Sequence, residues 1–237
     1  MRLIAFKAAF IYNEYNNPII YTDGLIIQGE VKGLDQKRKR PPGRPPKSPE
    51  PQAGIEAQLL EAAARLFMEK GYEQISLEQI AVDCQVTKAT IYYYYSNKAV
   101  LFTQAVVHLL GRAADITRLM LAGPGTLKER LVQIATGHLA ETRPDLMTML
   151  KEAESRLSPE QVQEIHDAEG RIHHIMAEAF REAAGRGELK PLSPSFLAFS
   201  FSSLLMLGNR AVLMEQYPSV RESAEAIVEL FLEGAAV

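Results

Sequence analysis

Tryptophan is absent from this chain, and cysteine occurs once, at Cys84. One cysteine cannot form an internal disulfide, so an apolar core has to hold the fold together, which is typical of a reducing cytoplasm. Because no histidine or second cysteine lies near it in the sequence, we interpret Cys84 as a small buried apolar residue. Hydrophobic residues make up 47% of the chain, which is enough for a packed core.

Long apolar runs and the short motifs of common enzymes are also missing. No stretch of about 18 residues is both apolar and free of charge, so the sequence predicts no membrane span. Residues 1–12 lack a clear small-residue cleavage site, which disfavours a signal peptide. There is no Gly-rich phosphate loop, nucleophile elbow or Glu-x-x-His pair. We therefore expect neither an enzyme nor a bound cofactor.

The formal net charge of −3 conceals an uneven distribution. Acidic residues are absent between positions 36 and 48, where the basic residues are Lys37, Arg38, Lys39, Arg40, Arg44 and Lys47. Prolines are concentrated in the same region, and proline fixes φ and cannot donate a backbone hydrogen bond. We interpret residues 35–54 as an extended, basic, Pro-rich arm. An acidic chain with one such arm is expected to meet a polyanion at that end.

Residues 1–34 differ from the rest of the chain. The segments 19–22 and 25–28 flank Asp23-Gly24, a two-residue turn signal that predicts a β-hairpin. Because an isolated hairpin is marginally stable in water, we interpret residues 1–34 as an atypical N-terminal extension. A second interpretation is a misassigned start, with translation beginning near Val31 or Leu34.

Helical periodicity begins at Ile55, and Gly71 is expected to end the first helix. Two shorter helices are predicted over 77–84 and 87–94, with Ser76 and Thr87 as N-caps. Later Gly, Pro and Ser clusters predict helices near 96–121, 126–141, 145–156, 159–185, 194–215 and 219–235. The predicted fold class is all-α, with a small domain over residues 55–102 and a larger one over 103–237.

The two short helices are typical of a helix-turn-helix, in which the second helix enters the major groove of DNA. The core between them is predicted to contain Leu77, Ile80, Ala81, Val86 and Ile91. Lys88 can reach a guanine edge or a phosphate, and Ala89 and Thr90 can contact a thymine methyl.

Four consecutive tyrosines, residues 92–95, follow on the second helix. They span more than one turn, so they cannot all face the core. We expect Tyr95 to pack inward with Ile91, and the other three to offer hydroxyls to phosphate oxygens. Lys98, near the start of the next helix, is expected to add a phosphate contact.

This segment resembles the DNA-binding domain of the TetR family of repressors. The matching residues are Ala63-x-x-Leu66-Phe67, Gly71-Tyr72, Ile80-Ala81, Val86 to Tyr95, Ser96-Asn97-Lys98 and Leu101-Phe102. The resemblance implies that Lys88, Ala89 and Thr90 contact bases. It implies that Tyr92, Tyr93, Tyr94 and Lys98 contact phosphates, and we add the caps Ser76 and Thr87 to the predicted DNA-binding set. Three departures from the family pattern are Cys84-Gln85 in place of Ala-Gly, Ala89 in place of Gly, and Tyr94-Tyr95 in place of His-Phe.

The basic arm contains Pro42-Gly43-Arg44-Pro45. This resembles the Gly-Arg-Pro core of AT-hooks, which implies that Arg44 enters a narrow minor groove. The alternative is a solvated linker that attracts phosphates without inserting.

For residues 103–237 the resemblance implies a helical domain that binds a small molecule and pairs with a second copy through the last two long helices. The apolar residues of these helices form either that seam or an intramolecular core: Phe196, Phe199, Leu204, Leu207, Ala211, Ile227, Val228, Phe231 and Leu232. Candidate ligand-binding residues, with plain core as the alternative, are Met147, Met149, Met176, Phe180, Phe199 and Met206. For His166, Glu169, His173 and His174 we favour solvated or hydrogen-bonded histidines over a metal site.

The sequence thus predicts a cytoplasmic homodimer that represses transcription from a palindromic DNA operator and is released by an unknown small-molecule effector. The helix over 96–121 joins the two domains and is the expected lever between them. The alternatives are a sequence-independent DNA binder, and, within the family, an activator or a repressor without a ligand.

Overall fold

The computed structural model describes residues 21–22, 25–26, 50–140, 146–209 and 214–235. The chain divides into two units, Met1–Ser48 and Pro49–Val237. In the first unit, strand β1 (Tyr21–Thr22) pairs antiparallel with β2 (Leu25–Ile26) within the segment predicted to form a hairpin, and the predicted turn residues 23–24 lie outside the described residues. The basic residues of the arm, including Arg44, lie outside the described residues.

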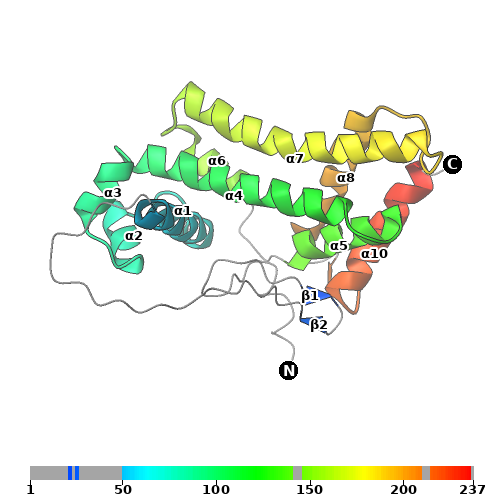
Figure 1. Cartoon of the computed structure of the whole chain (residues 1–237), viewed down its shortest axis with the longest axis horizontal. Helices are drawn as coiled ribbons and strands as arrows, with labels where there is room; N and C mark the ends of the chain where they lie inside the picture. The colour runs from blue at the N-terminus through cyan, green and yellow to red at the C-terminus, as the bar shows by residue number, and fades with distance from the viewer. Residues whose placement is uncertain (1–20, 23–24, 27–49, 141–145, 210–213, 236–237) are drawn as a thin grey trace, which may run out of the picture. The chain divides into compact units, whose positions relative to one another are not determined.

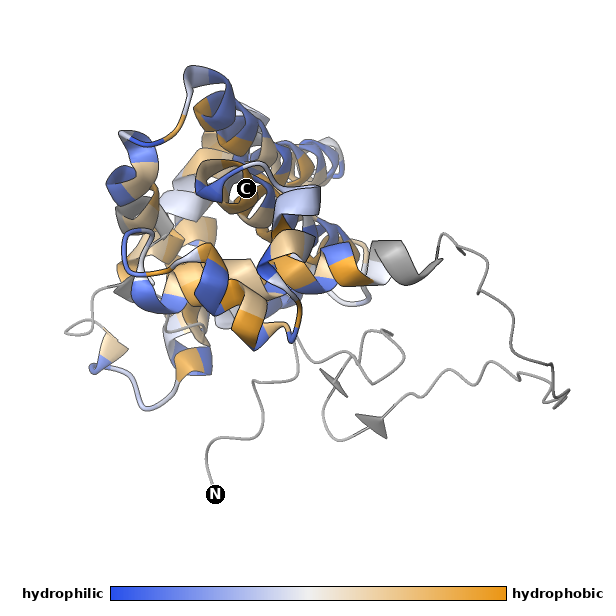
Figure 2. Ribbon diagram, turned by 90° about the vertical axis from the view of Figure 1, so that its left-hand side faces the viewer, coloured by the Kyte–Doolittle hydropathy of each residue, from blue (hydrophilic) through white to orange (hydrophobic). Residues whose placement is uncertain are grey.

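The described part of the second unit is helical, which confirms the all-α prediction (Figure 1). Its elements are α1 (Glu50–Lys70), α2 (Leu77–Asp83), α3 (Lys88–Tyr94), α4 (Lys98–Leu121), α5 (Leu127–Ala140), α6 (Leu146–Glu154), α7 (Pro159–Gly185), α8 (Pro194–Leu205), the 3-10 helix η2 (Met206–Asn209) and α10 (Val220–Ala235). Hydrophobic and hydrophilic residues alternate along these helices (Figure 2), as expected of helices that bury one face.

Two helix boundaries differ from the prediction. Helix α1 begins at Glu50, inside the region interpreted as an extended arm, because Pro51 occupies the first turn, where its missing N–H needs no partner. The helix expected over 194–215 ends at Leu205 and tightens into η2. At Gly208 the backbone lies so close to the Leu139 side chain of α5 that a Cβ there would clash with it.

The second unit contains two apolar cores. The N-terminal core includes Leu59, Phe67, Ile80, Ile91 and Phe102, and the C-terminal core includes Leu131, Phe180, Leu197, Phe201 and Phe231. In the N-terminal core, Phe102 meets the rings of Phe67 and Tyr72 edge-on, at centroid distances of 5.1 and 4.9 Å.

Helices α4 and α7 lie side by side and take part in both cores (Figure 1). Leu101 to Leu110 of α4 pack in the N-terminal core, whereas Ala114 and Leu121 pack in the C-terminal core. The N-terminal core also receives Met149 and Ala153 from α6. A displacement of α4 or α7 in one core is therefore transmitted to the other, because packed interiors have few voids to absorb it.

Helix α4 also bears on the expectation of no membrane span. By length and composition alone, Lys98–Leu121 is apolar enough to cross a membrane. Its packing against α1, α5 and α7 accounts for this apolar character, since a helix buried in two cores needs apolar residues on several faces.

Candidate nucleic-acid interface

Helix α2 is fixed at both ends by its own sequence. The Ser76 hydroxyl accepts a hydrogen bond from the Gln79 backbone N–H at 3.2 Å, and the Ser76 N–H donates to the Gln79 side chain at 2.7 Å. At the other end, Val86 N–H donates to Ala81 O at 2.9 Å and Gln85 N–H donates to Val82 O at 3.1 Å. These are the two bonds of a Schellman motif, which normally carries glycine at its left-handed position.

Gln85 occupies that position with a φ of 55°, and it is the one non-glycine with positive φ among the described residues. The departure from Ala-Gly noted in the sequence is therefore accommodated by a strained backbone rather than by a different turn. Helix α3 follows at once, capped by Thr87, whose hydroxyl accepts from the Thr90 N–H at 3.1 Å.

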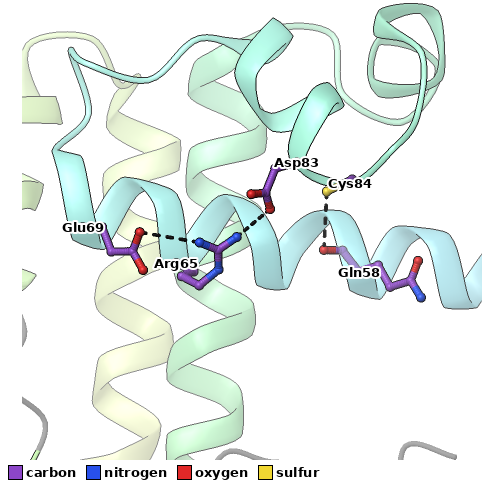
Figure 3. Close-up of polar contacts among 5 residues, drawn as sticks. All are labelled: Gln58, Arg65, Glu69, Asp83 and Cys84. Carbon is purple, nitrogen blue, oxygen red and sulfur yellow. Dashed lines mark hydrogen bonds and ion pairs between the residues drawn. The ribbon is translucent and has the colours of Figure 1, made fainter. Parts of the chain in front are cut away.

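The predicted core behind the two short helices is confirmed. Leu77, Ile80, Ala81 and Ile91 are buried, and Val86 packs against them partly buried. Arg65 of α1 braces the end of α2 through an ion pair with Asp83 at 2.5 Å, and also contacts Glu69 at 3.5 Å (Figure 3).

Cys84 is half-buried rather than fully buried, with its Sγ 4.0 Å from the Gln58 carbonyl oxygen (Figure 3). Desolvation by burial raises the pKa of its thiol. It packs against the N-terminal core, in keeping with its interpretation as a small apolar residue.

The four tyrosines divide as expected from helical geometry. Tyr95 is buried beside Ile91 in the N-terminal core, which confirms the prediction for it, and burial raises the pKa of its phenol. Tyr92 and Tyr93 are exposed, at 48% and 74%. Tyr94 is half-buried between them and the core, and meets the Tyr93 ring edge-on at 5.0 Å. One face of α3 thus offers aromatic rings and hydroxyls to solvent.

Lys88, the first residue of α3, already has partners. Its ammonium forms an ion pair with Glu78 of α2 and lies 5.6 Å from the centre of the Tyr92 ring. The hydrogen bond between them raises the pKa of Lys88 and lowers the pKa of Glu78. Both groups remain about half exposed, so the ammonium can still meet a further acceptor.

Lys98 contacts the loop that precedes α2. Its ammonium lies 4.3 Å from the centre of the Tyr72 ring and 3.5 Å from the Glu73 carbonyl oxygen, both in the loop between α1 and α2. Desolvation by burial lowers its pKa. A phosphate contact from Lys98 would require this side chain to turn outward.

The remaining predicted DNA-binding residues lie on the same pair of helices. Thr87 and Ala89 are exposed, and Thr90 is half-buried with its hydroxyl 2.9 Å from that of Thr87. Ser76 is half-buried at the start of α2.

Contacts from α6 reach the same loop as Lys98. Arg156, just after α6, forms an ion pair with Glu73 at 3.2 Å. At Gly71, which has a φ of 85°, a Cβ would lie 3.0 Å from the Glu152 side chain. Sequence reasoning missed these contacts, and the Glu78–Lys88 pair, because each joins residues from different helices and no local spacing signals them.

The candidate ligand-binding residues do not share one environment. Met176 and Phe180 are buried together in the C-terminal core, whereas Met149 is buried in the N-terminal core. Phe199 and Met206 are exposed on and just after α8. The side chain of Met147 lies outside the described residues.

The apolar residues of the last helices also divide. Ile227, Val228 and Phe231 of α10 are buried in the C-terminal core. On α8, Phe196 and Phe199 are 62% and 56% exposed, while Leu204 and Leu207 are partly buried. Ala211 lies outside the described residues.

The histidines of α7 make separate contacts. His166 lies 3.7 Å from Glu169, His174 lies 3.3 Å from Glu178, and the His173 ring is 4.3 Å from the Phe199 ring of α8. Within the described part of the chain, no group of three His, Cys, Asp or Glu residues is arranged to hold a metal ion.

Comparison with known proteins finds a related family. The family model for bacterial regulatory proteins of the tetR family matches residues 59–105, which run from α1 into α4. Over this region, which contains the helix-turn-helix, the chain is similar to the TetR family. The match supports a DNA-binding transcriptional regulator.

Individual relatives extend the likeness beyond the matched region. An uncharacterized HTH-type transcriptional regulator, YdeS of Bacillus subtilis, is 35% identical over 83 residues, which cover 35% of this chain and 39% of YdeS. A TetR-family regulator structure from Mesorhizobium loti superposes with a TM-score of 0.64 at 23% identity, covering 78% of this chain and 98% of that one.

The structure of the regulator FadR from Bacillus subtilis in complex with stearoyl-CoA has a TM-score of 0.60 at 22% identity, covering 75% of this chain and 97% of that one. At these identities the two structures show the fold of this chain.

Proposed function

We propose that this chain is a ligand-responsive repressor of the TetR family that binds a palindromic DNA operator as a homodimer in the cytoplasm. The observation that carries the proposal is how α3 is presented. Ile91 and Tyr95 anchor one face of the helix in the N-terminal core, while Tyr92 and Tyr93 stand exposed on the other. A short, rigidly backed helix with hydroxyls and a cation on its free face suits the major groove.

In the proposed complex, Lys88, Ala89 and Thr90 contact base edges at the start of α3. Tyr92, Tyr93 and Tyr94 donate hydroxyls to phosphate oxygens, which fixes the register of the protein on the duplex. Ser76 and Thr87 add hydroxyl contacts, and Lys98 leaves the Tyr72 ring for a phosphate.

The basic arm is proposed to supply most of the long-range attraction to DNA. In the helix-turn-helix region, Lys88 is paired with Glu78 and Lys98 is turned toward Tyr72, so few free cations face outward there. The six basic residues between 36 and 48 compensate for this, with Arg44 reaching the minor groove.

The homodimer is proposed to form through α8, with α10 beside it. Phe196, Phe199 and Met206 follow each other at helical spacing and are all exposed, and Leu230 of α10 is 58% exposed. Large apolar side chains gathered on one face mark an interaction surface. A two-fold axis through this surface would place two copies of α3 on the two halves of a palindrome.

The effector is proposed to be a small molecule with an apolar part that binds in the C-terminal core near Met176 and Phe180. The likeness in fold to FadR, whose structure contains stearoyl-CoA, supports this class of ligand. Met149, Met147, Phe199 and Met206 remain candidates only if the core rearranges around the ligand.

Release from DNA is proposed to be a population shift. An effector that prefers one spacing of the two α3 helices lowers operator affinity by the ratio of its affinities for the two states. Helix α4 supports such coupling because it takes part in both cores, and the Arg156–Glu73 ion pair adds a second link to the helix-turn-helix.

Selection of bound duplexes from a random DNA pool tests the proposal. An enriched inverted repeat, released by an acyl-CoA such as stearoyl-CoA, is the expected result. Enrichment of no sequence would instead favour sequence-independent binding driven by the basic arm. Enrichment without any effect of the tested ligands on DNA binding would leave a DNA-binding regulator whose effector is of another class.

A further inference from the structure

The ion pair between Glu78 and Lys88 joins the brace helix to the recognition helix at the DNA-facing surface. Glu78 stands in the first turn of α2, and Lys88 is the first residue of α3. Both side chains are about half exposed, so the pair itself contributes little to the stability of the fold. Nothing in the packing of the N-terminal core requires a carboxylate at this position.

The carboxylate has two effects on any duplex that approaches. It places a negative charge beside the residues proposed to contact phosphates, which weakens binding to every sequence equally. It also holds the Lys88 ammonium against α2 and the Tyr92 ring, and so restricts where that cation can reach.

A lysine ammonium has three N–H donors. One N–H of Lys88 donates to Glu78 and the ammonium also lies over the Tyr92 ring. A further N–H stays available for an acceptor in front of α3, such as a guanine edge. A phosphate contact from Lys88 would compete with the ion pair to Glu78. Glu78 therefore favours the contact that reads sequence over the contact that does not.

From this arrangement we propose that Glu78 is a positioning residue that determines DNA specificity. It keeps the Lys88 ammonium in position for a base contact and disfavours its contacts with phosphates. The inference rests on the proposed function and adds to it a residue that raises specificity at the expense of general affinity.

The test measures dissociation constants of full-length protein for its selected operator and for a random duplex, across a series of salt concentrations. In Glu78→Gln, affinity for random duplex should rise about threefold to tenfold, and its salt dependence should steepen by about 0.9 in log–log slope, the value for one added phosphate contact. Operator affinity should rise less, so that the ratio of operator to random affinity falls at least threefold.

Two matched variants separate positioning from general electrostatics. Glu69→Gln removes one negative charge from α1, where the partner is Arg65, and it should leave the ratio unchanged. In a Lys88→Met background, Glu78→Gln should likewise leave the ratio unchanged, because there is no cation left to position.

The outcomes are distinct. If wild-type protein does not prefer its operator over random duplex, the proposed function fails, and the inference with it. If wild-type protein does prefer it, but Glu78→Gln leaves the ratio unchanged or raises it, only the role of Glu78 is refuted. A fall in the ratio that persists without Lys88 would also overturn the proposal.

Discussion

Replacing Gln85 by glycine should stabilise the protein without altering its DNA-binding surface. Gln85 adopts a φ of 55° at the end of α2. For a residue with a side chain, the left-handed conformation costs roughly 1–2 kcal/mol relative to glycine. Glycine also increases the entropy of the unfolded chain, which lowers the free energy of unfolding by about 0.5–1 kcal/mol. The free energy of unfolding should therefore rise by about 0.5–1 kcal/mol.

Thermal or urea unfolding provides the assay. For a unit of this size, a change of about 1 kcal/mol shifts the melting midpoint by about 2–4 °C, so a rise of about 1–4 °C is expected. Gln133→Gly, at an exposed position inside α5, is the matched control and should lower stability by about 1 kcal/mol.

A loss of stability in Gln85→Gly would refute the reasoning that the turn is strained. Operator affinity should stay within twofold of wild type, because the two Schellman hydrogen bonds hold α3 in place with either residue. A large change in affinity would show that the Gln85 side chain itself takes part in binding.

Three further predictions concern the dimer, the pH dependence of stability and the arm. Phe199→Asp should yield monomers by analytical ultracentrifugation and lower operator affinity at least about 100-fold, since it places one charge from each subunit in the proposed seam. The control Leu119→Asp, on the exposed face of α4, should change neither the oligomeric state nor the affinity. A Phe199→Asp variant that stays dimeric would exclude α8 from the interface. Burial lowers the pKa of His108. Between that lowered pKa and the ordinary value near 6.5 the unfolded chain therefore binds more protons than the folded one, and the free energy of unfolding falls as pH falls through this window. His108→Gln should reduce the fall in melting midpoint between pH 7 and pH 5, whereas His166→Gln, at an exposed position, should not. Neutralising the four basic residues 37–40 should weaken DNA binding and reduce its salt slope by up to about 3.6, and an unchanged slope would exclude the arm from binding.

Much of the fold follows from local sequence signals. Ser76, Thr87 and Asn97 begin helices because each side chain caps a free backbone N–H, and Gly71 ends α1 because it adopts a positive φ. The inward position of Tyr95 follows from the helical period that it shares with Ile91. These features depend on a few adjacent residues and can be predicted without a structure.

Other features depend on contacts between distant residues. Helix α8 ends at Leu205, and the close approach of Gly208 to Leu139 that follows it is a contact that no local pattern encodes. The inward turn of Lys98 toward Tyr72 is equally non-local. Apolar residues at helical spacing left open whether the last helices form core or a dimer seam. Spacing alone cannot separate the two, because Phe231 of α10 is buried whereas Phe199 of α8 is exposed.

The most direct test of DNA recognition by α3 compares operator binding by wild-type protein and by the double variant Tyr93→Phe, Lys98→Met. Each removes a proposed contact to phosphate, and such charge-assisted hydrogen bonds contribute on the order of 1–2 kcal/mol each. At matched salt, and with an unchanged melting midpoint, operator affinity should fall about 30- to 1000-fold. Affinity within threefold of wild type would contradict the placement of α3 and Lys98 on the duplex.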